Sequence, residues 1–156
     1  MLYWIFDLDN TLYQLSNNIS FNYNLLTTDD QLNYLLMMLP SKKVIFTNGT
    51  YNHALKCLSN LNITEYFSKI ISRDKINSLK PNYYSYIRCM NSLNIKKTDI
   101  CVFFDDLPEN LIEAKNLGWT TVLIRREKYI HNNIDFWFPN IYLALNYFTT
   151  RINKKS

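Results

Sequence analysis

Short, mainly apolar runs alternate with helical patterns along most of the chain. The runs cover residues 2–6, 44–46, 70–71, 100–104 and 121–124. Runs of this kind are typical of strands buried on both faces, and the helices between them permit parallel pairing. The pattern predicts an α/β fold, a three-layer Rossmann-like doubly wound parallel sheet. One more apolar stretch, 136–148, predicts a last short strand and a helix.

Residues with strong positional preferences mark the ends of the predicted helices. Thr28 and Gln31 have the spacing of a capping box, and Pro40 ends the helix that they begin. Pro108 lies where the first turn of a helix accepts proline, and Gly118 lies where a helix C-terminus favours glycine. These signals place helices between the strands, as a doubly wound sheet requires.

Length and composition indicate one globular domain. The chain has 156 residues, of which 47% are hydrophobic and 15% are aromatic, so it can bury a core. We expect a single domain over 1–150 and a polar, frayed tail over 151–156. The polar stretch 14–27 predicts a loop or a short hairpin.

The chain has features of an intracellular protein. No apolar stretch approaches the roughly 18 residues of a membrane span, and the first residues lack the basic leader of a signal peptide. The three cysteines form no CxxC pair, which favours reduced, buried thiols over a zinc site. We therefore expect a cytoplasmic protein with no membrane partner.

The chain has only two glycines, Gly49 and Gly118. A dinucleotide-binding fingerprint needs three glycines in one turn, and a P-loop needs two before its lysine. Both phosphate-binding loops are therefore excluded, and any phosphate chemistry must use another cradle.

Polar side chains follow the predicted strands where each strand ends. Asp7 and Asp9 follow the first strand, Thr47 and Asn48 follow the second, and Asp105-Asp106 follow the fourth. In open α/β sheets, ligands bind beyond the carboxyl ends of the strands, so these groups should share one crevice. Four carboxylates there, with Lys80 as the counter-charge, suit Mg²⁺.

Such a crevice can handle a phosphoryl group. The Thr47 hydroxyl, the Asn48 amide, Lys80 and the metal would surround its oxygens with positive charge and donors. One carboxylate would then attack in line, and a second, protonated carboxyl would give a proton to the leaving oxygen.

The motifs DLDNTL, FTNG, KP and FFDD, in this order, resemble the haloacid dehalogenase superfamily of aspartyl phosphotransferases. The resemblance implies that Asp7 is the nucleophile and Asp9 the general acid and base. It implies that Thr47 and Lys80 hold the phosphate. It also implies a set of magnesium ligands: Asp7, Asp105, Asp106 and the backbone carbonyl of Asp9. An acid at the second position of the first motif is the phosphatase form, which dehalogenases lack.

Longer segments look like the pyrimidine 5′-nucleotidase branch of that superfamily. These segments are FDLDNTLY, TNGTYNHALKCLSNLNI, LKP and FFDDLPENLIEAKNLG. The likeness includes Asn52-His53 after the second motif and Asn110 after the acidic pair. That branch carries a helical cap between its first two motifs. Here the residues between Thr11 and Val44 suffice only for a loop and one helix, so we expect a capless core.

Further residues are candidates for a rim around the site. His53 and Asn52 begin a helix near it, and we interpret His53 as a structural or rim residue rather than a catalytic base. Arg73, Arg125 and Arg126 follow the third and fifth strands. Two interpretations stay open for these basic residues: a solvated face, or a positive rim that guides a nucleic acid or another polyanion to the site.

Three functions are weighed from the sequence. The first is a Mg²⁺-dependent phosphomonoester hydrolase that acts on a nucleotide or another small substrate. The second is a phosphatase for a phosphorylated macromolecule, either a nucleic-acid end or a phosphoprotein, because no cap restricts access. The third is a binding module that keeps the fold without turnover. A neighbouring subunit of a homo-oligomer, or the 14–27 loop, would be an alternative cover for the site.

Overall fold

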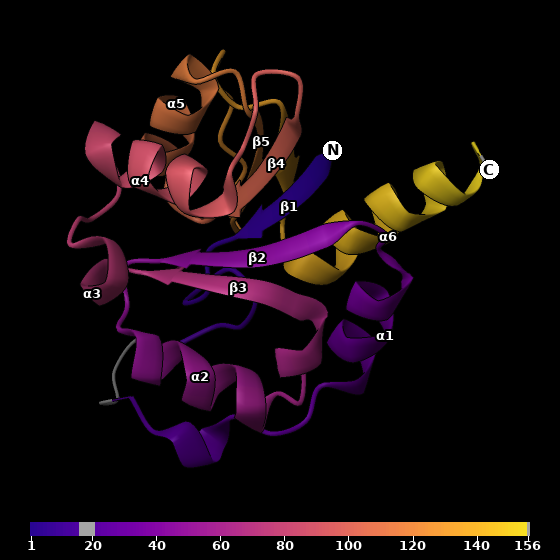
Figure 1. Ribbon diagram of the computed structural model, residues 1–156. Helices are drawn as coiled ribbons and strands as arrows, with labels where there is room; N and C mark the ends of the chain where they lie inside the picture. Colours follow the sequence, from indigo (N-terminus) through magenta and orange to yellow (C-terminus); the bar gives the residue numbers. More distant parts are fainter. Residues whose placement is uncertain (16–20, 156) are drawn as a thin grey trace.

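A computed structural model describes residues 1–15 and 21–155, and the described residues form a six-stranded, all-parallel sheet (Figure 1). Along the chain, its strands are β1 (Leu2–Phe6), β2 (Lys42–Thr47), β3 (Phe67–Ser72), β4 (Ile100–Asp105), β5 (Thr120–Ile124) and β6 (Phe136–Phe138). Their order in the sheet is β3-β2-β1-β4-β5-β6, which places β1 and β4 at the centre. This arrangement confirms the predicted parallel sheet.

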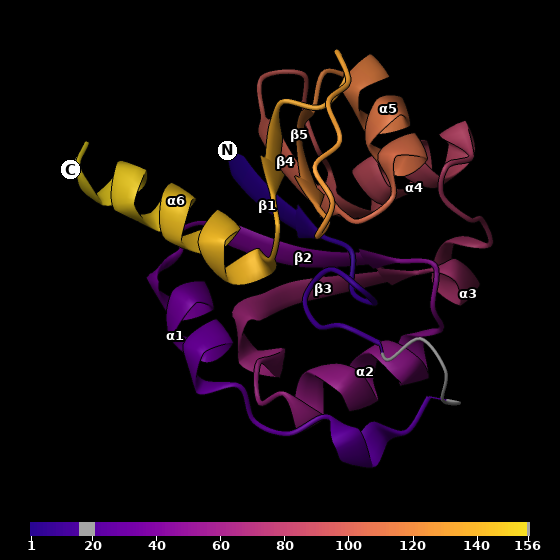
Figure 2. The ribbon, with the colours of Figure 1, turned by 180° about the vertical axis from the view of Figure 1, so that it is seen from behind.

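Helices cover both faces of the sheet. The α-helices are α1 (Asp30–Met38), α2 (Tyr51–Asn60), α3 (Arg73–Ile76), α4 (Tyr83–Leu93), α5 (Pro108–Asn116) and α6 (Ile141–Asn153), and the 3-10 helices are η1 (Tyr23–Leu25) and η2 (Thr64–Tyr66). Helices α4 and α5 lie on one face, and α1, α2 and α6 lie on the other (Figures 1 and 2). The three predicted layers are therefore present.

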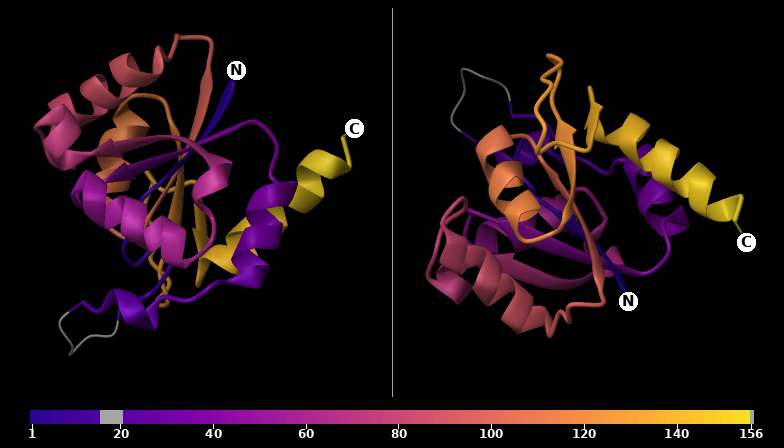
Figure 3. Two further views of the ribbon diagram at one scale, coloured as in Figure 1. Left: turned by 60° about the horizontal axis from the view of Figure 1, so that its bottom comes forward. Right: turned by 90° about the horizontal axis from the view of Figure 1, so that it is seen from above.

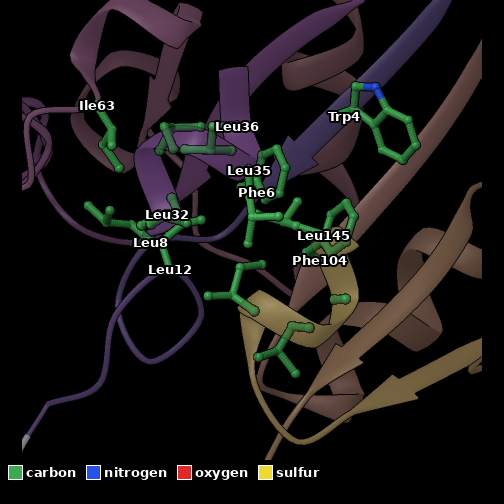
Figure 4. Close-up of a cluster of buried hydrophobic side chains, with 14 of the residues drawn as sticks. Trp4, Phe6, Leu8, Leu12, Leu32, Leu35, Leu36, Ile63, Phe104 and Leu145 are labelled. Carbon is green, nitrogen blue, oxygen red and sulfur yellow. The ribbon is translucent and has the colours of Figure 1, made fainter. Parts of the chain in front are cut away.

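Each face of the sheet has its own hydrophobic core, because successive side chains of a strand point to opposite faces. Trp4 and Phe6 of β1 join the cluster under α1, α2 and α6, shown in Figure 4. Tyr3 and Ile5 join the cluster under α4 and α5. Both faces of β1 are thus buried, which explains its uninterrupted apolar sequence.

The described part of the interval between β1 and β2 contains two helices. It holds η1 and α1, and α1 packs against α6 (Figure 3). The Asp29 side chain caps α1 by accepting from the Leu32 N–H, and it also accepts from the Tyr142 hydroxyl of α6. Because α1 belongs to the helical layer beside the sheet, this interval provides no separate cap domain among the described residues.

Three details differ from the sequence predictions. The N-cap of α1 is Asp29 rather than Thr28, one residue later than the capping-box pattern indicates. Helix α6 continues to Asn153, so the first residues of the tail predicted to fray are helical. Part of the 14–27 segment lies outside the described residues, and its described part contains η1. In contrast, Gly118 follows α5 with a φ of 83°, as predicted for a C-terminal glycine.

Across the described residues, every helix is too short or too polar to cross a membrane.

Candidate active site

The Lys80 ammonium group lies between two buried carboxylates. Its Nζ atom donates hydrogen bonds to Asp7 Oδ1 at 3.0 Å and to Asp105 Oδ2 at 2.8 Å. A third bond, 2.8 Å long, goes to the Phe46 carbonyl oxygen. Burial alone would lower the pKa of Lys80, but the charges of Asp105 and Asp7 outweigh burial and raise it. Lys80 therefore lies where its predicted role as counter-charge requires.

The central strands hold these carboxylates in place. Asp7 directly follows β1, and its N–H donates to the Phe104 carbonyl at 2.9 Å, which continues the pairing with β4. Asp105 is the last residue of β4, and its carboxylate accepts from the Leu107 N–H and from Asn110 Nδ2 of α5. Both carboxylates are thus fixed by neighbouring backbone and side chains.

Asp106 brings a third carboxylate to the same place. Single oxygen atoms of Asp7, Asp105 and Asp106 lie within 4.8 Å of one another. The Thr11 hydroxyl donates to Asp7 Oδ2 at 3.1 Å and lies 3.4 Å from Asp106 Oδ1. Burial raises the pKa of Asp7 to about 6, with Lys80 opposing the rise and Asp106 adding to it. Burial, with repulsion from a neighbouring carboxylate, also raises the pKa of Asp105 and of Asp106.

This group of carboxylates fits the predicted magnesium ion. All of its donor atoms are carboxylate oxygens, the ligands that Mg²⁺ prefers. Three carboxylates against one ammonium group leave an excess of negative charge, which a divalent cation would neutralise. The Asp9 carboxylate belongs to a different cluster, so only its backbone carbonyl stays a predicted magnesium ligand.

We expect the metal-free protein to lose stability as pH rises from about 4 to about 6, because burial raises the pKa of Asp7 from 3.8 in the exposed, unfolded chain to about 6 in the folded chain. Between these values the folded state binds more protons than the unfolded state, so raising the pH favours unfolding. Magnesium should oppose this loss, since it binds the ionised carboxylates. Urea unfolding in EDTA and in Mg²⁺ across this pH range measures both effects.

The Asp106→Asn variant is the matched control for this titration. It removes one of the three mutually repelling carboxylates, so its stability in EDTA should depend less on pH. A wild-type unfolding free energy that rises through the same pH window would show that the pKa of Asp7 is not raised in the folded chain.

Thr47 and Asn48 lie at the end of β2, beside Lys80. The Thr47 hydroxyl is buried and accepts from the Gly49 N–H at 3.0 Å. The Asn48 side chain forms two hydrogen bonds with the Lys80 backbone. Asn48 Nδ2 donates to the Lys80 carbonyl at 3.0 Å, and Asn48 Oδ1 accepts from the Lys80 N–H at 2.8 Å. This pairing gives Asn48 a positioning role for Lys80, whereas its predicted donation to phosphate stays a prediction.

The Asp9 carboxylate faces the start of α2. His53 Nε2 lies 2.9 Å from Asp9 Oδ1 and 3.2 Å from Oδ2, and the Tyr13 hydroxyl donates to Oδ1. Sequence reasoning assigned no role to Thr11 or Tyr13. Their signal is spacing, because each lies four residues after a carboxylate of the first motif, Asp7 or Asp9, that it contacts.

The predicted rim arginines follow strands on opposite sides of β1 and line different pockets. Arg125 and Arg126 line a pocket of about 800 Å³ together with Asp106, whereas Arg73 lines a separate pocket. The strand order explains the separation, since β3 and β5 lie on opposite sides of β1. Asn52 is exposed in the first turn of α2. The arginines thus line two different pockets, and the positive rim stays a prediction.

The fold agrees with the comparison to known families. The model of the haloacid dehalogenase-like hydrolase family matches residues 22–124, more than half of the chain. The chain belongs to this family of hydrolases.

Solved structures of the same superfamily have a similar fold. An L-2-haloacid dehalogenase from Xanthobacter autotrophicus with covalently bound chloropropionic acid matches with a TM-score of 0.66 and 20% identity, over 80% of this chain and 62% of the other. A HAD phosphatase from Thermococcus onnurineus matches with a TM-score of 0.61 and 25% identity, over 76% and 57%. A HAD-hydrolase from Bacillus subtilis bound to magnesium matches with a TM-score of 0.65 and 13% identity, over 77% and 55%. The chain thus spans about three fifths of the length of these proteins.

Proposed function

We propose that the chain is a Mg²⁺-dependent phosphomonoester hydrolase that works through a phosphoryl group carried on Asp7. The observation that carries the proposal is the Lys80 ammonium group held between Asp7 and Asp105, with Asp106 and Thr47 at neighbouring strand ends. This arrangement supplies a carboxylate nucleophile and, around it, the positive charge and donors that a transferring phosphoryl group needs.

In the first step, an Asp7 carboxylate oxygen attacks phosphorus in line with the leaving oxygen. The new bond joins Asp7 to phosphorus, and the bond from phosphorus to the leaving oxygen breaks. The Asp9 carboxyl group gives its proton to that oxygen, which leaves as an alcohol. Lys80 and the Thr47 hydroxyl hold the phosphoryl oxygens during this step.

In the second step, the Asp9 carboxylate takes a proton from a water molecule. That water attacks phosphorus, the bond to Asp7 breaks, and inorganic phosphate leaves with Asp7 and Asp9 restored. The carboxylates of Asp7, Asp105 and Asp106 would hold Mg²⁺, which when bound supplies charge stabilisation for the phosphoryl oxygens.

Asp9 supports a phosphatase over a dehalogenase. A halide leaves without a proton, whereas an alkoxide needs one, so a second carboxyl group is useful for phosphate esters. One protein with a similar fold, from T. onnurineus, is a HAD phosphatase, and another, from B. subtilis, is bound to magnesium. The longer motifs, including Asn52-His53, favour a nucleotide as the small substrate.

A substrate screen tests the proposed function. Mononucleotides, phosphosugars, phosphopeptides and 3′- or 5′-phosphorylated oligonucleotides are compared with L-2-chloropropionate, in Mg²⁺ and in EDTA. We expect phosphate release that depends on Mg²⁺ and no chloride release. Chloride release would favour a dehalogenase, and binding without turnover of any phosphate ester would favour a non-catalytic module.

A phosphorylated macromolecule is the second candidate substrate, because Arg125 and Arg126 lie in the pocket beside Asp106, although Glu127 also lines it and lies 3.9 Å from Arg125 Nε. Arg125 and Arg126 line it together with the polar side chains of Asn10 and Gln14. The two guanidinium groups can contact phosphates beyond the one that reacts.

Charge reversal of Arg125 and Arg126 to Glu should therefore weaken turnover of a 5′-phosphorylated oligonucleotide at least about tenfold more than turnover of p-nitrophenyl phosphate. Measurements of kcat/KM at two salt concentrations give this comparison. Arg73→Glu is the matched control, since Arg73 lines a different pocket. An equal loss on both substrates would exclude the macromolecular substrate at this pocket.

A further inference from the structure

We propose that His53 is a positioning residue for the proton-transferring carboxylate of Asp9, and that Tyr23, from the short segment between β1 and β2, holds His53 in turn. This inference rests on the function proposed above. It assigns a role to the η1 segment, which lies between the first two strands where a cap would be inserted.

The Asp9 carboxylate is held from two sides. His53 Nε2 lies 2.9 Å from Asp9 Oδ1 and 3.2 Å from Asp9 Oδ2, so the imidazole is within hydrogen-bond distance of both oxygens. The Tyr13 hydroxyl donates to Oδ1. The side chains of His53 and Asp9 are 20% and 31% exposed, so the pair borders solvent and can be reached by a substrate. Two partners restrict the rotation that a single acid on a loop would otherwise have.

His53 is itself fixed by Tyr23 of η1 and by Phe21, which precedes η1 in the chain. The Tyr23 hydroxyl forms a 2.8 Å hydrogen bond with His53 Nδ1, on the side of the ring opposite to Asp9. The Phe21 ring packs edge-on against His53, with centroids 4.9 Å apart. Tyr23 is anchored in turn, because its carbonyl accepts from Asn60 Nδ2 of α2 at 2.9 Å. A chain of contacts therefore runs from α2 through Tyr23 and His53 to Asp9.

These contacts end beside Thr47, to which the proposed function assigns phosphate binding. A Cβ atom on Gly49 would lie 3.1 Å from His53 Cδ2, 3.3 Å from Thr47 Oγ1 and 3.8 Å from Asp9 Oδ2. These three side chains thus lie close to one another around Gly49, where a larger residue would be crowded. His53 therefore holds Asp9 within reach of a group bound at Thr47, as proton delivery to the leaving oxygen requires.

The dependence of rate on the leaving group tests this role. The leaving oxygen of p-nitrophenyl phosphate departs with little need for a proton, whereas that of n-propyl phosphate requires one. For His53→Leu, kcat/KM should fall on n-propyl phosphate at least about tenfold more than on p-nitrophenyl phosphate. His53→Gln, which places an N–H near the position of Nε2, should restore most of the difference. Tyr23→Phe should change the ratio in the same direction by a smaller factor, about threefold.

Two matched controls change the same residue types elsewhere. His131→Leu alters the other histidine, which stacks on Tyr129, and Tyr66→Phe removes a hydroxyl bonded to Asn33; both should leave the ratio unchanged. Thermal melting identifies any variant that fails to fold. If His53→Leu is one of them, the ratio of kcat/KM on the two substrates is compared between Tyr23→Phe and wild type.

The failures of the two proposals are distinguishable. Equal losses on both substrates in His53→Leu, or no rescue by Gln, would make His53 a merely structural residue and overturn the positioning role alone. A wild-type chain that hydrolyses neither ester in Mg²⁺ would overturn the proposed function, and the positioning role with it.

Discussion

Replacing Asp7 by Asn should abolish phosphate release, with a loss of about 10⁴-fold or more, while the chain remains folded. The amide of Asn is a poor nucleophile, so no covalent phosphoryl group can form at this position. Folding should survive because Asn has nearly the same shape and its carbonyl can still accept from Lys80 Nζ. Removing one of three clustered carboxylates also relieves repulsion in the metal-free protein.

The measurement is steady-state hydrolysis of p-nitrophenyl phosphate together with the intact mass of acid-quenched enzyme. Wild type should carry a phosphoryl group during turnover, and Asp7→Asn should not. Asp30→Asn makes the same chemical change on the exposed first turn of α1 and should retain full activity. Retained turnover in Asp7→Asn would mean that another group attacks the substrate.

Replacing Lys80 by Met should cost about 3–5 kcal/mol of unfolding free energy at neutral pH. The Lys80 side chain is 1% exposed, and its ammonium group is within 3.0 Å of both Asp7 and Asp105. Met keeps the volume but leaves two buried carboxylates without their cation. Those carboxylates can escape the penalty by protonation, so the loss of stability should be smaller near pH 5 than near pH 8.

Urea unfolding in EDTA at both pH values measures this effect. Lys115→Met is the matched control: Lys115 also contacts an aspartate, Asp135 at 2.7 Å, but its side chain is 35% exposed. That ion pair should contribute no more than about 1 kcal/mol. A Lys80→Met variant as stable as the control would show that the buried charges of Asp7 and Asp105 are not balanced by this lysine.

Much of the fold could be read from the sequence because both faces of the sheet are covered. Strands such as β1 and β4 are then uninterrupted apolar runs, and the residue after each run marks the carboxyl end of a strand. Asp7, Thr47 and Asp105 were predicted to share a crevice on that argument. The start of α1 could not be fixed to one residue, since Asp29 and Thr28 are both good caps; in the structure Asp29 is the cap and also accepts from Tyr142 of α6.

The basic residues show the limit of that argument. Sequence places Arg73 after β3 and Arg125 after β5, and both lie at carboxyl ends of strands. The order of strands in the sheet then separates them, because β3 and β5 flank the centre on opposite sides. Strand order depends on how the crossover connections pack, which a single sequence does not display.

The sequence by itself determined the α/β class, the chemical types gathered at the strand ends and the exclusion of glycine-rich phosphate loops. Only the tertiary structure decided how those groups are held: Lys80 bridges Asp7 and Asp105, Asn48 pairs with the Lys80 backbone, and Tyr23 reaches His53. The physical reason is the separation in sequence of the residues that interact. Apolar periodicity is a local property of the chain, whereas hydrogen bonds between residues 25 or more positions apart exist only after the sheet and its helices have packed.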